Sequence, residues 1–185
     1  TIEIVPENKR DSFFVKGTKK LGDNFEAFAD IAFSRFDLTA RIAPNTAPFT
    51  VATNSAQFDQ YVRPYLSAAQ LARGVSSVSG NYRAYDWGTR DSQTITDSKH
   101  AVAGIEGEIA GWSVNSALTW SQNSIDERYV GGYMRNAEFS AMLRNGAFNP
   151  FAPIGTVSPE LQQQIDASIY NGSIREASTT LKAFD

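Results

Sequence analysis

The sequence has no cysteine and only one histidine among its 185 residues. The chain therefore has no disulfide, no thiolate nucleophile and no zinc–sulfur site, and a site built from several histidines is excluded. The net charge is −3, so there is no basic field of the kind that binds nucleic acid. These absences argue against nucleic acid as a partner, and we expect neither a metal nor another cofactor.

Long apolar runs are absent too. None approaches the roughly 18 residues of a transmembrane helix, and the mean hydropathy is −0.32. No signal-peptide pattern is visible in the opening residues, TIEIVPENKR, as is also expected of a mature protein or an internal piece. Membrane-spanning strands escape such averages, because every second residue in them is polar.

The organising feature is a pair of expected strands, 97–109 and 112–124, joined by a minimal turn at Ala110-Gly111. Alternate positions are apolar and share one face, because side chains alternate across a strand. These positions are Ala101, Ala103, Ile105, Ile109, Trp112, Val114, Leu118 and Trp120. Within residues 100–122 each strand contributes about ten residues, which matches the roughly 9–11 residues that a tilted strand needs to cross a bilayer. Tryptophans near both ends of the second strand match the interfacial girdles of membrane barrels.

A second hairpin repeats this design, with strands at 10–21 and 25–39 around the turn residues Gly22, Asp23 and Asn24. The face from Phe25 to Phe33 is apolar at every second residue. A fifth strand is expected at 173–184, and residues 1–9 read as an irregular lead-in.

Two long polar connections, 40–96 and 125–172, leave from the opposite end. We expect short helices in them: one over 57–73, bent or started near Pro64, one capped by Asn136, and one that starts at Ser158-Pro159 and ends at Asn171-Gly172. Residues 81–97 are expected to form a separate hairpin arm that turns near Gly88.

Short turns on one side and long loops on the other are the layout of bacterial outer-membrane barrels. The expected fold class is therefore all-β: residues 1–185 form an antiparallel transmembrane β-barrel segment of about five long strands, with short helices in its external loops. Such barrels start at about eight strands, so either strands are missing from the chain shown or the membrane interpretation is wrong.

Three stretches carry a family resemblance: SFFVKGTKKLGDNFEAFADIAFSRF, WGTRDSQTITDSKHAVAGIEGEIAGWSVNSALTWSQN, and NAEFSAMLRNGAFNPF with the following SPELQQQI. Together they resemble the barrel region of TonB-dependent outer-membrane receptors. The resemblance implies a location in the outer membrane of a Gram-negative bacterium and the import of a scarce nutrient, such as an iron chelate, cobalamin or an oligosaccharide. It implies no enzymatic activity, and contact with outer-membrane lipid.

The family also couples to a TonB-type energy-coupling protein through a plug domain, and its barrels have about 22 strands. Neither a plug domain nor a TonB-box-like segment is found in these residues. The chain is therefore expected to be a fragment, roughly a quarter of such a barrel.

The loops hold the candidate ligand-binding residues, because aromatic rings stack on sugars and arginines bind carboxylates. The candidates are Tyr82, Arg83, Tyr85, Trp87, Arg90, Tyr129, Tyr133 and Arg135. The alternative for all of them is packing within the loops.

Two other classes of protein stay open. A soluble, secreted β-sandwich that binds carbohydrate or another surface ligand would show the same alternation. A β-rich hydrolase could use Glu106 and Glu108 as paired carboxylates, although hydrated charge explains them as well. His100 lies near Ser98 and Asp97, but nearness in sequence is not the geometry of a catalytic triad.

Overall fold

The computed structural model describes residues 3–185, which form two compact units. The sheet unit contains residues 3–41, 92–129 and 172–185, and the loop unit contains residues 42–91 and 130–171. Of the expected lead-in over 1–9, residues 1 and 2 lie outside the described residues. The first strand already begins at Glu7.

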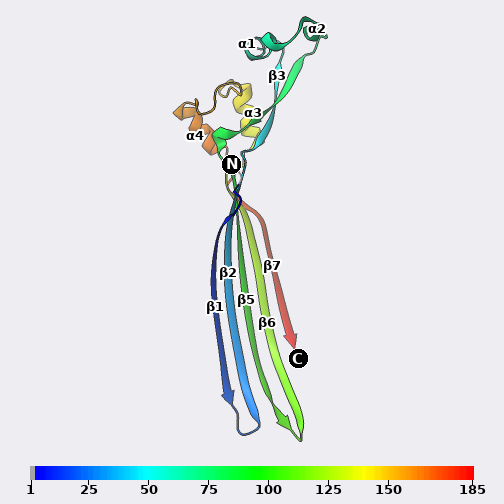
Figure 1. Cartoon of the computed structure of the whole chain (residues 1–185), viewed down its shortest axis with the longest axis vertical. Coiled ribbons are helices and arrows are strands. Elements are labelled where there is room, and N and C mark those ends of the chain that lie inside the picture. The colour runs from blue at the N-terminus through cyan, green and yellow to red at the C-terminus, as the bar shows by residue number, and fades with distance from the viewer. Residues whose placement is uncertain (1–2) are drawn as a thin grey trace. The chain divides into compact units, whose positions relative to one another are not determined.

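The sheet unit is built on five strands that run antiparallel to their neighbours (Figure 1). They are β1 (Glu7–Lys20), β2 (Phe25–Ile42), β5 (Arg90–Ile109), β6 (Trp112–Gly131) and β7 (Gly172–Phe184), in the spatial order β1-β2-β5-β6-β7. The expected number of long antiparallel strands is thus confirmed. The sheet is open and does not close into a barrel.

Both tight turns form where the sequence places them, and residues in both adopt positive φ. Gly22, between β1 and β2, has φ +76°. Between β5 and β6, Ala110 has φ +49° and Gly111 has φ +81°, as the two central residues of a type I′ turn require. This turn suits the right-handed twist of its strands, and it brings β5 and β6 side by side along their length.

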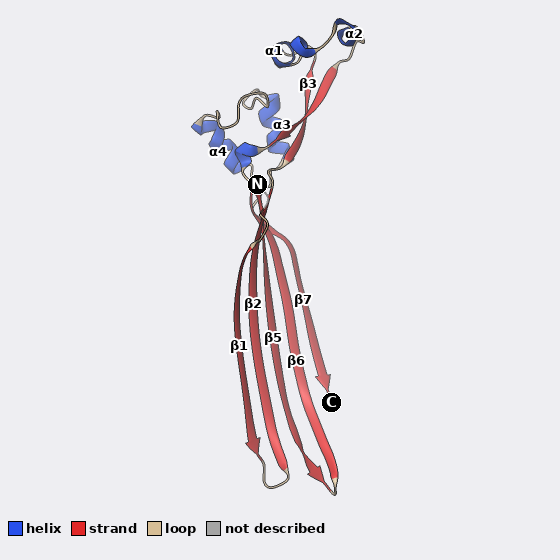
Figure 2. Ribbon diagram, in the orientation of Figure 1, coloured by secondary structure: helices blue, strands red, loops and turns tan. Residues whose placement is uncertain are grey.

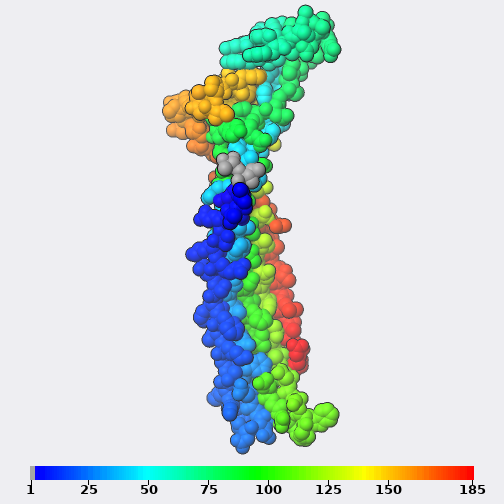
Figure 3. Space-filling model, viewed as in Figure 1, coloured from blue at the N-terminus to red at the C-terminus, as the bar shows by residue number. Residues whose placement is uncertain are grey.

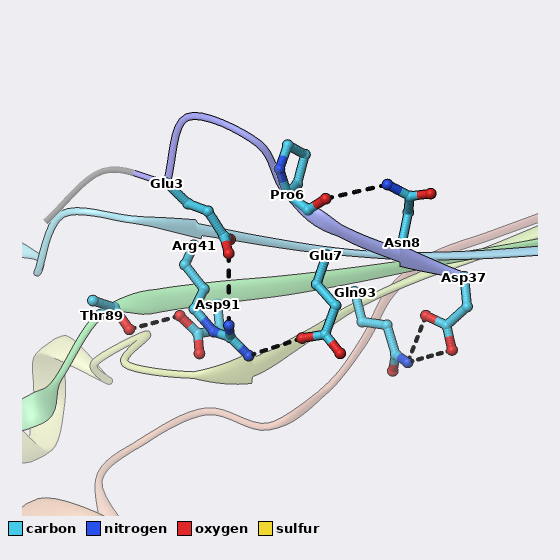
Figure 4. Close-up of polar contacts among 9 residues, drawn as sticks. All are labelled: Glu3, Pro6, Glu7, Asn8, Asp37, Arg41, Thr89, Asp91 and Gln93. Carbon is cyan, nitrogen blue, oxygen red and sulfur yellow. Dashed lines mark hydrogen bonds and ion pairs between the residues drawn. The ribbon is translucent and has the colours of Figure 1, made fainter.

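The strands β2, β5 and β6 extend beyond the residues that alternate between apolar and polar. Polar side-chain contacts accompany these extensions. The Arg41 guanidinium lies 3.7 Å from the Glu3 carboxylate and 3.6 Å from that of Glu7 (Figure 4). Gln93 Nε2 donates to both carboxylate oxygens of Asp37, at 2.8 and 3.0 Å. The connections therefore cover residues 43–89 and 132–171, which is shorter than the expected 40–96 and 125–172.

All helices of the described chain lie in the loop unit (Figure 2). Within it, β3 (Thr46–Ala52) and β4 (Ser77–Arg83) form a two-stranded ribbon. The segment between them carries α1 (Ala56–Tyr61), η1 (Arg63–Tyr65) and α2 (Ala68–Leu71). The 3₁₀ turn η2 (Tyr85–Trp87) follows β4, and the second connection holds α3 (Asn136–Arg144) and α4 (Pro159–Ala167).

The expected hairpin arm over 81–97 is wrong. β4 pairs with β3, and the chain from Arg90 onward is already a strand of the large sheet. The Pro- and Thr-rich β3 looks like a loop in sequence, but Pro48 is tolerated because a two-stranded ribbon has free edges. Gly80 of β4 lets the ring of Phe49 lie so close that a Cβ there would be 2.7 Å from it.

The helix ends follow the sequence in part. Ser158 caps α4 as expected, accepting the Leu161 N–H at 3.2 Å, with Pro159 in the first turn. Asn136 is not a cap, because the helix begins at this residue and Arg135 takes the cap position. The expected helix over 57–73 is three short pieces, and α4 ends at Ala167, before Asn171.

Candidate functional site

One face of the sheet carries an exposed apolar band. We define the apolar band as the outward side chains of residues 25–33 of β2, 101–109 of β5 and 112–120 of β6, together with Phe13 and Val15 of β1, which pair with Phe33 and Ile31. Several of its larger members are open to solvent: Trp112 is 77 % exposed and Phe13 is 60 % exposed. Soluble proteins rarely expose contiguous apolar patches larger than a few hundred Å², so this face needs a partner.

The band has the same depth on three strands. It takes up nine residues in each of the ranges just given, although the strands themselves contain 18, 20 and 20 residues. Roughly 9–11 residues carry a tilted strand across a bilayer. Trp112 and Trp120 mark the two limits of the band on β6, which are the levels where aromatic girdles lie in membrane barrels.

Beyond the band, the same face becomes charged. Arg35 of β2 lies 3.7 Å from Asp97 of β5, and both line a cavity of about 590 Å³ with Asp126 and Glu176. The face therefore has an apolar half next to the tight turns and a charged half next to the long connections.

The opposite face of the sheet, which we call the polar face, is held by side-chain hydrogen bonds between β5 and β6. Ser98 Oγ donates to Asn123 Oδ1 at 3.1 Å, and His100 Nδ1 lies 2.6 Å from Ser121 Oγ. Near the turn, Asn115 Nδ2 donates to Glu106 at 3.4 Å. The expected division of this hairpin into an apolar and a polar face is thus present in the structure.

The residues considered for catalysis do not assemble into a site of that kind. Asp97 pairs with Arg35 on the face of the apolar band, whereas His100 bonds Ser121 on the polar face, so no Asp–His relay forms. Glu106 and Glu108 share an open hollow on the polar face. Among residues 3–185 no group of three or more His, Cys, Asp and Glu side chains is placed to hold a metal ion.

The loop unit has an aromatic core. Tyr82 and Phe148 rings lie 5.1 Å apart between centroids, and the Trp87 ring lies 5.2 Å from Phe148 and 5.6 Å from Phe139. Trp87 Nε1 donates to the buried Ser168 hydroxyl at 2.7 Å, which ties η2 to the end of α4. These contacts join segments that are far apart in sequence.

Two of the candidate ligand residues belong to this core. Trp87 is 3 % exposed and Tyr82 is 8 % exposed, so the faces of both rings are covered by protein. Both side chains pack within the loop unit, as the alternative noted for them expects, and their contact with a ligand stays a prediction. Alternating aromatics in a short segment look the same in sequence whether they face ligand or core.

The arginines of the candidate set bond to the backbone or to neighbours. Arg83 Nη1 donates to Pro44 O, and Arg90 Nε donates to Ala43 O, both at 2.9 Å. The Arg135 guanidinium lies 5.7 Å from the centre of the Tyr170 ring and 3.8 Å from Glu138. These contacts fix the places where the loops leave the strands.

Among the tyrosines, Tyr129 and Tyr133 are partly buried and take part in interactions. Tyr85 is different because half of its side chain, 50 %, is exposed. It lies in η2, next to core residues that hold it in place, and it remains the best-placed ligand candidate.

The structure adds one site that the sequence did not indicate, a pocket of about 290 Å³ in the loop unit. We call it the Asp86 pocket, and Tyr82, Asn149, Thr156 and Ser158 also line it. The Tyr82 hydroxyl donates to Asp86, and the Gly155 N–H donates to the same carboxylate at 3.3 Å. Burial, with the neighbouring carboxylate, raises the pKa of Tyr82 well above its usual value near 10.

Comparison of the chain with protein-family models, with characterised proteins and with solved structures finds no match in any of the three. Among residues 3–185, no helix has both the length and the apolar character needed to cross a membrane.

Proposed function

We propose that this chain forms part of the β-barrel of a TonB-dependent receptor, which imports a scarce nutrient across the outer membrane of a Gram-negative bacterium. The observation that carries the proposal is the apolar band, which has one depth on three adjacent strands and tryptophans at both limits on β6. Lipid is the partner that fits a band of this depth.

The proposal assigns the polar face to the barrel interior. Charged residues pair in the register of β1 and β2 there, Lys16 opposite Asp30 and Lys20 opposite Glu26, and side chains of this kind suit a hydrated lumen. Barrels of this type have at least about eight strands, so the proposal requires further strands alongside β1 and β7. In the space-filling view these two strands, blue and red, form the borders of the sheet (Figure 3).

The loop unit would supply ligand contacts, because long connections on one side of such barrels are external. Its packed aromatic core gives a rigid base for exposed groups such as Tyr85. By resemblance to the family, transport would then use a plug domain and a TonB-type protein, and no chemical step. An iron chelate, cobalamin and an oligosaccharide are the ligand classes to test.

The first experiment is fractionation of the native full-length protein. We expect it in the outer-membrane pellet, released by detergent and not by high salt or alkaline washing. Recovery as a soluble secreted or periplasmic species would overturn the proposal and favour a β-sandwich whose second sheet covers the apolar band.

The second experiment measures uptake of each ligand class in cells that lack the native gene and carry a variant. Tyr85→Ala should lower uptake of the right ligand roughly two- to tenfold, because a stacking contact contributes about 0.5–1.5 kcal/mol. Tyr65→Ala is the matched control, since Tyr65 is also an exposed tyrosine of the loop unit but lies in η1. Equal effects of the two changes would contradict a ligand role for Tyr85.

A further inference from the structure

The apolar band is not uniform, because it contains a hollow of about 480 Å³ where small side chains meet larger ones. Ala29 of β2 and Ala101 and Ala103 of β5 are its small members, and Ile31, Leu118 and Trp120 are its bulky ones. We call this the alanine hollow. A methyl group reaches less far from the sheet than an indole or an isobutyl group, so three alanines in adjacent strands leave a depression.

A lysine side chain lies at the rim of the hollow. Lys182 of β7 lines it and pairs with Trp120 in the register of β6 and β7. Lys99 of β5 is two residues beyond Ala101, on the same face. Both lysines therefore lie where the apolar band gives way to the charged half of the face.

Neither lysine is neutralised by the protein. In the part of the chain that the structure describes, Lys99 and Lys182 have no ion-pair partner, whereas Arg35 of the same face is paired with Asp97 at 3.7 Å. Both lysines are exposed. Two unpaired ammonium groups at the end of an apolar depression are complementary to a molecule with a long hydrocarbon chain and an anionic head.

We propose that the alanine hollow is a specific binding site for an anionic membrane lipid. One acyl chain lies in the hollow against Ala101 and Ala103, and the phosphate is held by Lys182 with Lys99 beside it. The indole of Trp120 lies at the same level, where tryptophan is favoured at the boundary between hydrocarbon and headgroups. This inference rests on the proposed membrane location of the apolar band.

The positive charges of Lys99 and Lys182 determine which lipid headgroup binds best. A zwitterionic lipid of the same chain length would fill the hollow equally well, but its own cation would oppose the two lysines. Each basic side chain near an anionic lipid surface strengthens binding roughly fivefold. The acyl chain should therefore set whether a lipid binds, and the lysines should set which lipid is preferred.

The test is native mass spectrometry of the full-length protein purified in a neutral detergent and titrated with phosphatidylglycerol or with phosphatidylcholine of the same acyl chains. We expect one phosphatidylglycerol to be retained preferentially. Lys182→Gln should weaken its retention roughly fivefold and leave phosphatidylcholine unchanged. Ala101→Phe, which fills the hollow, should reduce retention of both lipids.

Lys20→Gln is the matched control, because Lys20 is an exposed lysine on the polar face. A loss of phosphatidylglycerol as large as that of Lys182→Gln would overturn the proposal and show general charge attraction. Equal retention of both lipids by the native protein would also overturn it. Should Ala101→Phe fail to fold, Ala103→Leu tests the same hollow with a smaller change.

The outcome separates this inference from the function proposed above. If the protein needs detergent but shows no lipid preference, the lipid site is wrong and the receptor proposal is unaffected. If the protein is soluble without detergent, both proposals are wrong.

Discussion

The indole of Trp87 holds together three segments of the loop unit. Its ring packs against Phe139 of α3 and Phe148 of the following turn, and its Nε1–H donates to Ser168 after α4. A side chain in this position stabilises the structure through both its burial and a buried hydrogen bond.

We therefore expect Trp87→Ala to destabilise the loop unit by about 3–5 kcal/mol, the usual cost of removing a large aromatic from a core. The measurement is the rate of limited proteolysis within residues 132–171, which should rise steeply. Tyr85→Ala, two residues away and half exposed, should change the rate little. Similar rates for the two variants would place Trp87 outside the core.

The Tyr82 hydroxyl gives a prediction for alkaline pH. Its pKa is raised in the folded loop unit, so above about pH 10 the unfolded chain loses this proton while the folded chain keeps it. The folded state then binds more protons than the unfolded state, and stability falls as pH rises. Below about pH 10 both states keep the proton, so this residue does not make stability depend on pH there.

The check is proteolysis of the loop unit at pH 9 and at pH 11. The native protein should become more susceptible at the higher pH. Tyr82→Phe, which cannot titrate, should show a smaller change between the two. An identical pH response in both proteins would mean that another group is responsible.

Among the elements, the turn between β5 and β6 is the one that a single substitution could most simply stabilise. Ala110 has φ +49°, a left-handed conformation that costs an L-residue with a Cβ roughly 1–2 kcal/mol. Asparagine and glycine adopt this conformation with less strain. The neighbouring Gly111 has φ +81° and already has the residue type that its position prefers.

We expect Ala110→Asn to stabilise the hairpin by about 0.5–1 kcal/mol and Gly111→Val to destabilise it by at least 1 kcal/mol. The free energy of unfolding in urea, measured in detergent micelles, tests both. A stabilising Gly111→Val would show that the turn does not have this backbone geometry in the protein.

At the scale of the whole molecule, the two faces of the sheet should tolerate charge differently. Ile105 is the central residue of the apolar band on β5, and Glu106 beside it points to the polar face. An arginine facing lipid near the bilayer midplane costs about 2–4 kcal/mol, whereas one facing the lumen costs little.

Ile105→Arg should therefore reduce assembly into the outer membrane and lower the urea midpoint, and Glu106→Arg should leave both nearly unchanged. Membrane fractionation with quantification of the folded protein gives the result. Equal tolerance of the two substitutions would argue that the apolar band does not face lipid.

Much of the sheet could be predicted because the alternating pattern of a strand lies in consecutive residues. Residues 25–33 are apolar at every second position from Phe25 to Phe33, and the short turn at Ala110-Gly111 leaves only one way to join 101–109 to 112–120. The extensions of β2, β5 and β6 escaped prediction because polar pairs such as Gln93 and Asp37 have no hydrophobic period. Asp86 escaped as well, since nothing nearby in sequence marks a carboxylate that a distant loop will enclose.

The sequence by itself determined the five long strands, their two faces and their tight turns, because each depends on residues that are close together in the chain. The tertiary structure alone decided that β4 pairs with β3 and that Tyr82 and Trp87 lie in a core. Pairing and burial depend on contacts between residues far apart in the chain, such as Trp87 and Ser168, which are 81 positions apart. No local period records such contacts.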